Sequence, residues 1–233
     1  MRVTCLGDSI THGSVSSNYV DLLARRWNAS GFAFVNAGVN GDLAYNVAQR
    51  LDAVIAERPD IVTLLVGTND VNAQFDERWL RRYEKDQKLP VRPTRQWYAE
   101  NVAAILARLA SETDAKVVLL DIPPLGEDLS SRMNVLVREY NASIADVAAA
   151  SGVPVLPLHD RLLDLLPPGH SPPAYRGNRS DIIKAALIHD ALRRSWDDVS
   201  RRNGLSVLTD QIHLNDRAAG VVADLIGGVL GDA

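Results

Sequence analysis

Cysteine is almost absent from this sequence, and basic side chains are not in excess. The one cysteine, Cys5, cannot form an internal disulfide, and because it lies in an apolar stretch we expect a small core residue rather than a redox group. A fold built on disulfides is excluded. The chain carries 29 acidic and 25 basic side chains, a formal net charge of -4. No broad basic face for nucleic acid or anionic lipid is therefore expected.

Long apolar runs are also missing. No stretch approaches the roughly 18 apolar residues of a membrane-spanning helix, and Met1 is followed directly by the apolar run 2–6, without the leader and cleavage region of a secretory signal. Internal repeats and low-complexity segments are absent as well. We expect a soluble, cytoplasmic protein with no nucleic-acid partner and no integral membrane association.

The sequence instead alternates short apolar runs with stretches of helical periodicity. Its 233 residues, 46% of them hydrophobic, have the proportions of an ordinary globular protein. β-rich runs predict buried strands, and apolar residues at spacings of three and four predict helices between them. The predicted strands cover residues 2–6, 32–36, 61–66, 116–122 and 153–157, and the predicted helices cover 19–27, 43–57, 94–111, 133–151 and about 216–230.

Strands that alternate with helices favour a parallel sheet, because parallel strands need crossover connections and these supply helices for both faces. We predict an α/β fold, a three-layer α/β/α sandwich around a five-stranded parallel sheet, in a single domain over residues 1–233. Two connections, 71–93 and 158–207, are longer than this architecture needs and are predicted to be insertions. The second begins with a turn-rich stretch around Gly169, turns helical over about 180–201, and is a candidate lid.

The first predicted strand ends in Gly7-Asp8-Ser9-Ile10, which places Ser9 just beyond a carboxyl end and near the start of a helix. Ligands of open parallel sheets bind outside the carboxyl ends of the strands, and helix amides there favour developing negative charge. Ser9 is therefore a candidate nucleophile. Taken alone, a serine in such a loop is more often a helix N-cap or a turn residue.

Glycine and asparagine follow the next two strands, in a block ending Gly41-Asp42 and in Gly67-Thr68-Asn69-Asp70. The backbone N–H of Gly41 and the side-chain amide of Asn69 are donors suited to an anion. Together with Ser9 they form a candidate oxyanion hole. Each residue also has a structural alternative, turn geometry for Gly41 and a helix cap for Asn69.

The block Asp210-Gln211-Ile212-His213 stands immediately before the last predicted helix. A carboxylate three residues before a histidine can bond one ring nitrogen and leave the other free to take a proton, as the base and orienter of a triad do. A lone pair of this kind is more often a polar loop. A metal site is a third alternative, but no HExxH, CxxC or clustered His/Asp spacing accompanies the pair.

Taken together, the four blocks resemble those of the SGNH hydrolase superfamily, the GDSL-type esterases and lipases, named for Ser, Gly, Asn and His. They occur in the family's order and nearly end to end, with Ile10 where the family name has leucine. The resemblance implies a flavodoxin-like fold and hydrolysis of a small-molecule ester through an acyl-enzyme. That mechanism requires no metal and no organic cofactor.

The resemblance also implies a role for each signature residue. Ser9 matches the nucleophile, His213 the general base and Asp210 its orienting carboxylate. The oxyanion donors are then the backbone N–H groups of Ser9 and Gly41 and the amide of Asn69. The residues lead to the same roles without the family name, because a serine hydroxyl needs a base to become nucleophilic and a tetrahedral intermediate needs preorganised donors.

The other polar and aromatic residues singled out are expected to be structural. Carboxylates beside the motifs are interpreted as loop supports, and the remaining histidines as surface or structural residues. For the aromatic side chains, packing of a helix against the protein is preferred to lining a binding groove. These are Asp8 and Asp70; His12, His159, His170 and His189; and Trp79, Tyr83, Trp97 and Tyr98.

A short acyl ester, such as an acetylated sugar, is the favoured substrate, since no long apolar stretch suits adsorption to a lipid surface. A lysophospholipase or thioesterase-type lipid hydrolase is the first alternative. A non-catalytic binding module on the same fold is the second, although such a protein would usually lack a signature residue. A nucleotide-binding α/β protein is disfavoured because the sequence has no Walker A loop and no GxGxxG fingerprint.

Overall fold

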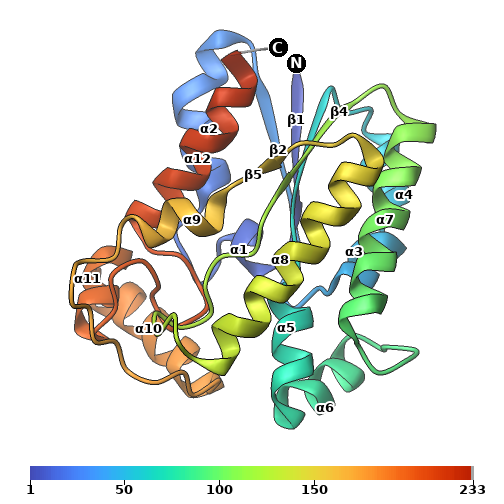
Figure 1. Cartoon of the computed structure of the whole chain (residues 1–233). Coiled ribbons are helices and arrows are strands. Elements are labelled where there is room, and N and C mark those ends of the chain that lie inside the picture. The colour runs from blue at the N-terminus through green and yellow to red at the C-terminus, as the bar shows by residue number, and fades with distance from the viewer. Residues whose placement is uncertain (232–233) are drawn as a thin grey trace.

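The computed structural model describes residues 1–231 and contains a five-stranded sheet with only parallel pairings. The strands are β1 (Arg2–Gly7), β2 (Ala33–Gly38), β3 (Ile61–Leu65), β4 (Lys116–Leu120) and β5 (Val155–Leu156). Their order in the sheet is β2-β1-β3-β4-β5, so the chain moves from β1 to one side and then back to the other (Figure 1). Such a reversal opens a crevice at the carboxyl ends of the strands. The five predicted strands are confirmed.

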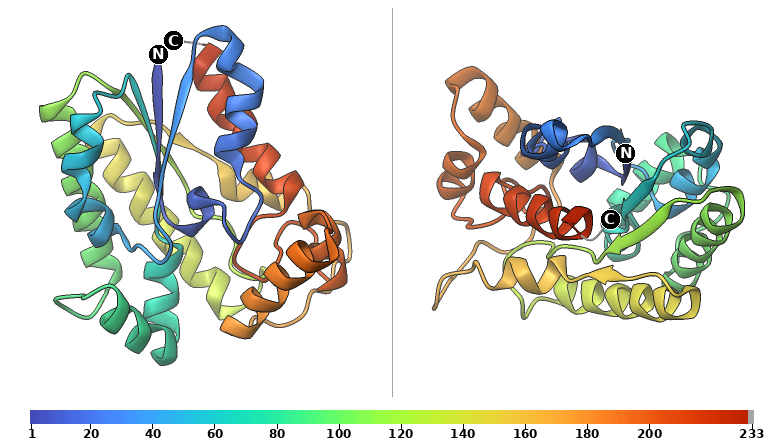
Figure 2. Two further views of the ribbon diagram at one scale, coloured as in Figure 1. Left: turned by 180° about the vertical axis from the view of Figure 1, so that it is seen from behind. Right: turned by 90° about the horizontal axis from the view of Figure 1, so that it is seen from above.

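Helices cover both faces of the sheet (Figure 2). Along β3, Ile61 and Leu65 point into one core and Val62 and Leu64 into the other, because successive side chains of a strand alternate. The first face is covered by α2 (Tyr19–Trp27), α9 (Leu158–Leu163) and α12 (Asp216–Gly231), and the second by α3 (Ala44–Gln49), α4 (Leu51–Ala56), α7 (Arg95–Glu112) and α8 (Arg132–Ser151). The predicted three-layer α/β/α sandwich is confirmed.

Cys5 lies on β1 inside the first of these cores. Its thiol is unpaired and fully buried, and burial raises the pKa of that thiol to about 12. The thiolate is the reactive form of cysteine. The residue is therefore the small core side chain expected from the sequence.

Two helices predicted as continuous are each broken into two. The helix predicted over 43–57 is interrupted at Arg50, whose backbone is non-helical (φ -109°, ψ 14°). The Arg50 guanidinium donates to the Asp42 carboxylate at 2.6 Å and to the Gly7 carbonyl at 2.9 Å. The helix predicted over 180–201 becomes α10 (Arg179–Leu192) and α11 (Trp196–Arg202). Arg193 adopts the left-handed conformation (φ 47°) between them. Both predictions of one continuous helix are wrong.

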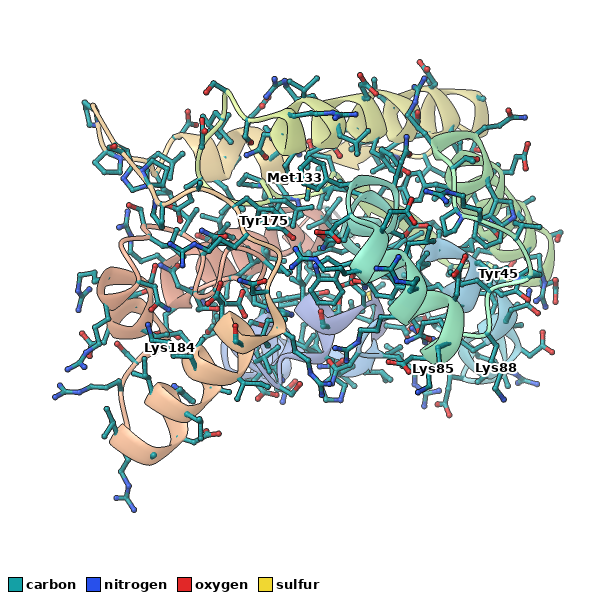
Figure 3. The ribbon with its side chains drawn as sticks, turned by 90° about the horizontal axis from the view of Figure 1, so that it is seen from below. Tyr45, Lys85, Lys88, Met133, Tyr175 and Lys184 are labelled. Atoms are coloured by element: carbon teal, nitrogen blue, oxygen red, sulfur yellow. The ribbon has the colours of Figure 1, made fainter. Side chains whose placement is uncertain are left out.

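The long connections are largely helical, and two of their helices lie at the carboxyl end of the sheet. The first contains the end of α5 (Thr68–Phe75) and α6 (Glu77–Asp86), and the second contains α9, α10 and α11. Figures 1 and 3 show α6 and α10 at this end of the molecule. The remaining elements are the short helix α1 (Ser9–His12) and the 3-10 turn η1 (Asn28–Ser30). Within residues 1–231, no helix is both long enough and apolar enough to cross a membrane.

Candidate active site

The carboxyl end of β1 runs directly into α1, and Ser9 is the first residue of that helix. Asp8 is the N-cap, since its carboxylate accepts the backbone N–H of Ile10 at 3.0 Å. Ser9 is therefore not the cap of this helix. Its hydroxyl is left to bond elsewhere, although the residue is only 7% exposed.

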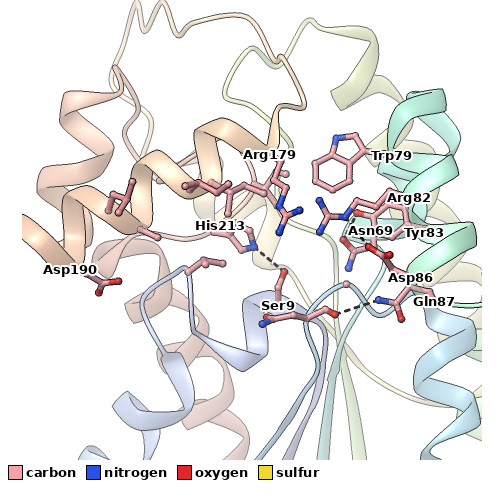
Figure 4. A pocket seen from close by; sticks show the side chains of 18 residues that line it. Ser9, Asn69, Trp79, Arg82, Tyr83, Asp86, Gln87, Arg179, Asp190 and His213 are labelled. Carbon is pink, nitrogen blue, oxygen red and sulfur yellow. Dashed lines mark hydrogen bonds and ion pairs between the residues drawn. The ribbon is translucent and has the colours of Figure 1, made fainter.

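Ser9, His213 and Asp210 are joined by one chain of hydrogen bonds (Figure 4). Ser9 Oγ lies 2.9 Å from His213 Nε2, and His213 Nδ1 lies 2.8 Å from Asp210 Oδ2. Because an ionised carboxylate only accepts, Nδ1 carries the ring proton and Nε2 accepts from the serine hydroxyl. The hydroxyl is thus directed at the one free lone pair of the imidazole.

Burial and pairing act in opposite directions on this histidine and its carboxylate. Burial raises the pKa of Asp210, but attraction to His213 and the hydrogen bonds that Asp210 accepts outweigh burial, so this pKa lies below its usual value. Burial lowers the pKa of His213. The charge and the hydrogen bond of Asp210 raise this pKa by more than burial lowers it, so it lies above its usual value. The pair therefore stabilises an imidazolium.

The segment that carries these two residues forms a tight turn. The Thr209 N–H donates to the His213 carbonyl at 2.7 Å. Inside the turn, Asp210 Oδ1 accepts the N–H groups of Ile212 and His213 at 3.0 and 2.9 Å. The three-residue spacing noted in the sequence thus fixes one carboxylate oxygen on the backbone and leaves the other for the histidine ring.

Gly41 lies beside Ser9 at the same cavity. It has φ +84°, a conformation that favours glycine, and a Cβ at this position would lie 2.6 Å from Gln87 Nε2. Among the described residues, neither the backbone N–H of Ser9 nor that of Gly41 donates a hydrogen bond. Both groups are free to donate to a ligand.

The side-chain amide of Asn69 is held from two sides. The Tyr83 hydroxyl donates to Asn69 Oδ1 at 2.7 Å, and Asn69 Nδ2 donates to the Asp42 carbonyl at 2.8 Å. The orientation of the amide is fixed, because only the oxygen accepts and only the nitrogen donates, and a second N–H of Nδ2 is left over. The N-cap of α5 is Gly67, so Asn69 does not cap its helix.

A cavity of about 580 Å³ lies against Ser9, Gly41, Asn69 and His213 (Figure 4). Both long connections contribute to its walls. The first supplies Trp79, Arg82, Tyr83, Asp86 and Gln87 from α6 and the residue after it, and the second supplies Arg179, Ile182, Ile183, Ala186, Leu187 and Asp190 from α10. The structure therefore brings all the predicted site residues except Asp210 to the cavity lining, and Asp210 stands behind His213.

The four aromatic residues fall into two groups. Trp97 stacks on Tyr45 at 5.1 Å, and Tyr98 packs against Tyr140, as expected for helix packing. Trp79 and Tyr83 also stack on each other, at 5.5 Å, but they line the cavity as well. For these two residues the packing interpretation was incomplete, because α6 lies over the site.

Two buried carboxyl groups support the loops without facing the cavity. Asp70 Oδ2 accepts the Ala44 N–H at 3.2 Å, as Asp8 accepts that of Ile10. Burial raises the pKa of Asp8 to about 7 and holds that of Asp70 well above its usual value. These are the structural supports expected from the sequence.

Within residues 1–231, no three His, Cys, Asp or Glu side chains are grouped so as to hold a metal ion.

Glu127 belongs to none of the sequence motifs, yet it fixes the segment leading to Asp210. Its carboxylate accepts the N–H groups of Ser206, Val207 and Leu208 at 2.7–2.9 Å. His170 Nε2 lies 2.6 Å from the same carboxylate, so this histidine is structural, as predicted. The only signal for Glu127 in the sequence is its place after the fourth predicted strand, where the other site loops also begin.

A family model described as the GDSL-like lipase/acylhydrolase family matches residues 5–221. The chain therefore belongs to this family, and the resemblance to the SGNH hydrolase superfamily is confirmed. The class that this family defines is that of SGNH-type carboxylic ester hydrolases, as the sequence predicted.

Individual relatives agree with this class. An acetylxylan esterase of Geobacillus stearothermophilus is 29% identical over 129 residues, which are 48% of this chain and 53% of that esterase, so the match spans about half of the relative. The crystal structure of the acetyl xylan esterase AlAXEase superimposes with a TM-score of 0.66 at 21% identity, over 98% of this chain and 99% of that chain. That of Axe2, an acetylxylan esterase from Geobacillus stearothermophilus, gives 0.65 at 15% identity, over 97% and 91%. These two likenesses show the fold.

Proposed function

We propose that this protein hydrolyses carboxylic esters with short acyl groups, acetyl esters first, through an acyl-enzyme on Ser9. The observation that carries the proposal is the hydrogen-bonded chain from Ser9 Oγ through His213 to Asp210, lying against a cavity beside unused donors. A hydroxyl whose proton is already directed at a base is prepared for nucleophilic attack.

In the first half of the proposed reaction, Ser9 Oγ attacks the ester carbonyl carbon while His213 Nε2 takes the hydroxyl proton. The carbonyl oxygen becomes an oxyanion and accepts hydrogen bonds from the N–H groups of Ser9 and Gly41 and from Asn69 Nδ2. His213 then gives the proton to the leaving alcohol, which departs and leaves an acyl-serine. Asp210 keeps the ring in the required tautomer and stabilises its positive charge.

In the second half, a water molecule repeats the sequence on the acyl-serine. His213 Nε2 takes one water proton, the hydroxide oxygen attacks the acyl carbon, and the proton returns to Ser9 Oγ as the carboxylic acid leaves. The same three donors stabilise the second oxyanion. No group beyond the residues named is needed to balance these steps.

The acetyl assignment is supported by the acetylxylan esterases among the relatives. A second candidate, a lipid acyl hydrolase, is favoured by one observation. The cavity-lining Ile183 and Leu187 of α10 are 49% and 61% exposed, an apolar surface of the kind a long acyl chain would contact.

A p-nitrophenyl ester series from acetyl to long acyl chains distinguishes the two candidates. Short-acyl hydrolysis predicts a kcat/KM that falls with chain length, and the lipid candidate predicts that it rises. The Ser9→Ala variant and a serine-directed phosphonate test the nucleophile, with Ser30→Ala as a matched control at an exposed serine of η1. Full hydrolysis by Ser9→Ala would refute the proposal, as would a phosphonate that labels the protein elsewhere and leaves Ser9 unmodified.

A further inference from the structure

Two guanidinium groups in the lining of the cavity point toward each other (Figure 4). Arg82 comes from α6 and Arg179 from α10, the two segments in which the sequence shows no family motif. Like charges that face each other repel, and water screens this repulsion only in part because Arg82 is half-buried while Arg179 is exposed. The arrangement is favourable when an anion lies between the two groups.

A cavity carboxylate pairs with only one of these two arginines. Arg82 Nε lies 3.3 Å from Asp86 Oδ2, and its guanidinium lies over the Trp79 ring, 5.6 Å from the centroid. The guanidinium of Arg179, an exposed residue, makes no ion pair and no hydrogen bond within the described chain, 1–231. Asp190 is eleven residues further along α10, about 16 Å at 1.5 Å per residue. One positive charge at this end of the cavity is therefore unmatched.

A neighbouring arginine shows what a neutralised guanidinium looks like here. Arg78, also on α6, lies 2.7 Å from Asp76 Oδ2 and bonds to the Arg176 carbonyl and to Asn178. Its donors are used within the protein. Those of Arg179 are not, although both residues border the same small hollow beside the cavity.

We propose that Arg82 and Arg179 bind a carboxylate on the alcohol part of the substrate, so that the preferred esters are acetyl esters of acidic alcohols such as hydroxy acids and sugar acids. The inference rests on the proposed function, because an acetyl group carries no charge and the carboxylate must then belong to the alcohol. Guanidinium groups pair with carboxylates through two parallel N–H···O bonds. A single unmatched charge suits a monoanionic carboxylate better than a dianionic phosphate.

The test compares 3-acetoxybenzoate with its methyl ester, which share the acetyl group and the ring and differ in charge. Each kcat/KM is divided by the hydroxide-catalysed rate of the same ester, so that leaving-group differences cancel. The parent protein is expected to prefer the anionic ester by about tenfold, the size of one charge-assisted hydrogen bond. Arg179→Ala should reduce this ratio to about one, and Arg179→Lys should retain part of it.

Arg193→Ala is the matched control, because Arg193 lies at the other end of α10 and borders a different hollow. It should keep the parental ratio. Raising the ionic strength from about 0.05 M to about 0.5 M should lower the ratio in the parent but not in Arg179→Ala. A parental ratio of one or less, or a ratio that survives in Arg179→Ala, would overturn the proposal while ester hydrolysis itself stands.

If neither ester is hydrolysed, that result counts against the proposed function. A binding experiment still decides the proposal of a carboxylate site. In calorimetric titrations of Ser9→Ala, 3-hydroxybenzoate should bind about tenfold more tightly than its methyl ester. The difference should vanish in the double variant Ser9→Ala, Arg179→Ala. Equal affinities in the single variant would refute the carboxylate site.

Discussion

The loops that carry the signature residues and the helices that wall the cavity meet at one place but are fixed in different ways. Ser9, Asn69, Asp210 and His213 are between 4% and 7% exposed, and each is held by hydrogen bonds from neighbouring segments. On α10, by contrast, Leu187 is 61% exposed. The reacting groups must be positioned to a fraction of an ångström, and the buried loops hold them so, whereas the walls contact the substrate away from the reacting atoms. Changes in the walls should therefore alter specificity, and changes in the loops should alter turnover.

The largest effect is expected from Ser9→Ala or His213→Ala. Each removes one end of the proton path, so kcat/KM for an acetyl ester should fall by about 10⁴-fold or more. The circular dichroism spectrum and the unfolding midpoint should stay close to the parental ones. A variant that keeps near-parental turnover would show that the buried chain of hydrogen bonds is structural only.

The next largest effect is expected from Asn69→Ala. Loss of one oxyanion donor should lower kcat by about 10²–10³-fold with little change in KM, because the donor acts on the transition state. Tyr83→Phe is the matched control, since it removes only the hydroxyl that orients the amide and should cost less. If KM alone rose, Asn69 would belong with the substrate-binding walls.

Glu127→Ala tests how firmly the segment before Asp210 is held, through its effect on stability. Three backbone N–H groups and His170 would lose their buried acceptor, so the free energy of unfolding should fall by about 2–4 kcal/mol. Urea unfolding measures this, with Glu139→Ala, an exposed carboxylate on α8, expected to change the stability by less than about 0.5 kcal/mol. An equal effect of both variants would mean that the segment before Asp210 is held by other contacts.

The smallest effect concerns pH. The protonated imidazole cannot take the serine proton, so kcat/KM should fall as pH drops through the pKa of His213, which lies above its ordinary value of 6.5. Asp210→Asn removes the attraction that raises this pKa, and the midpoint of ring titration followed by NMR should move to lower pH. An unchanged or higher midpoint would show that Asp210 does not set the protonation of the ring.

The sequence predicts the sheet well, because buried strands and covering helices leave a local periodicity. It predicts the motif residues for a similar reason, since each block lies at the carboxyl end of a predicted strand or before a predicted helix. The break at Arg50 could not be predicted, because it depends on contacts with Gly7, 43 residues away. Glu127 was missed for the same reason, as its partners lie 43 or more residues later in the chain.

The single-domain organisation, the lid over 158–207 and the catalytic roles of the site residues stay predictions until they are measured. The walls of the cavity are where sequence reasoning was weakest. Arg82 and Arg179 are two of many scattered arginines, and only the fold brings them to face each other across the cavity.

The hydrogen bond between Ser9 and His213 spans 204 residues. During synthesis Ser9 leaves the ribosome 204 residues before His213, so over that interval a nascent chain holds the proposed nucleophile without its proposed base. Under the proposed mechanism, a reagent that reacts only with an activated serine would therefore count molecules in which these two segments have come together. The proposed site would then also report folding, even in a mixture where partly folded chains have the same mass.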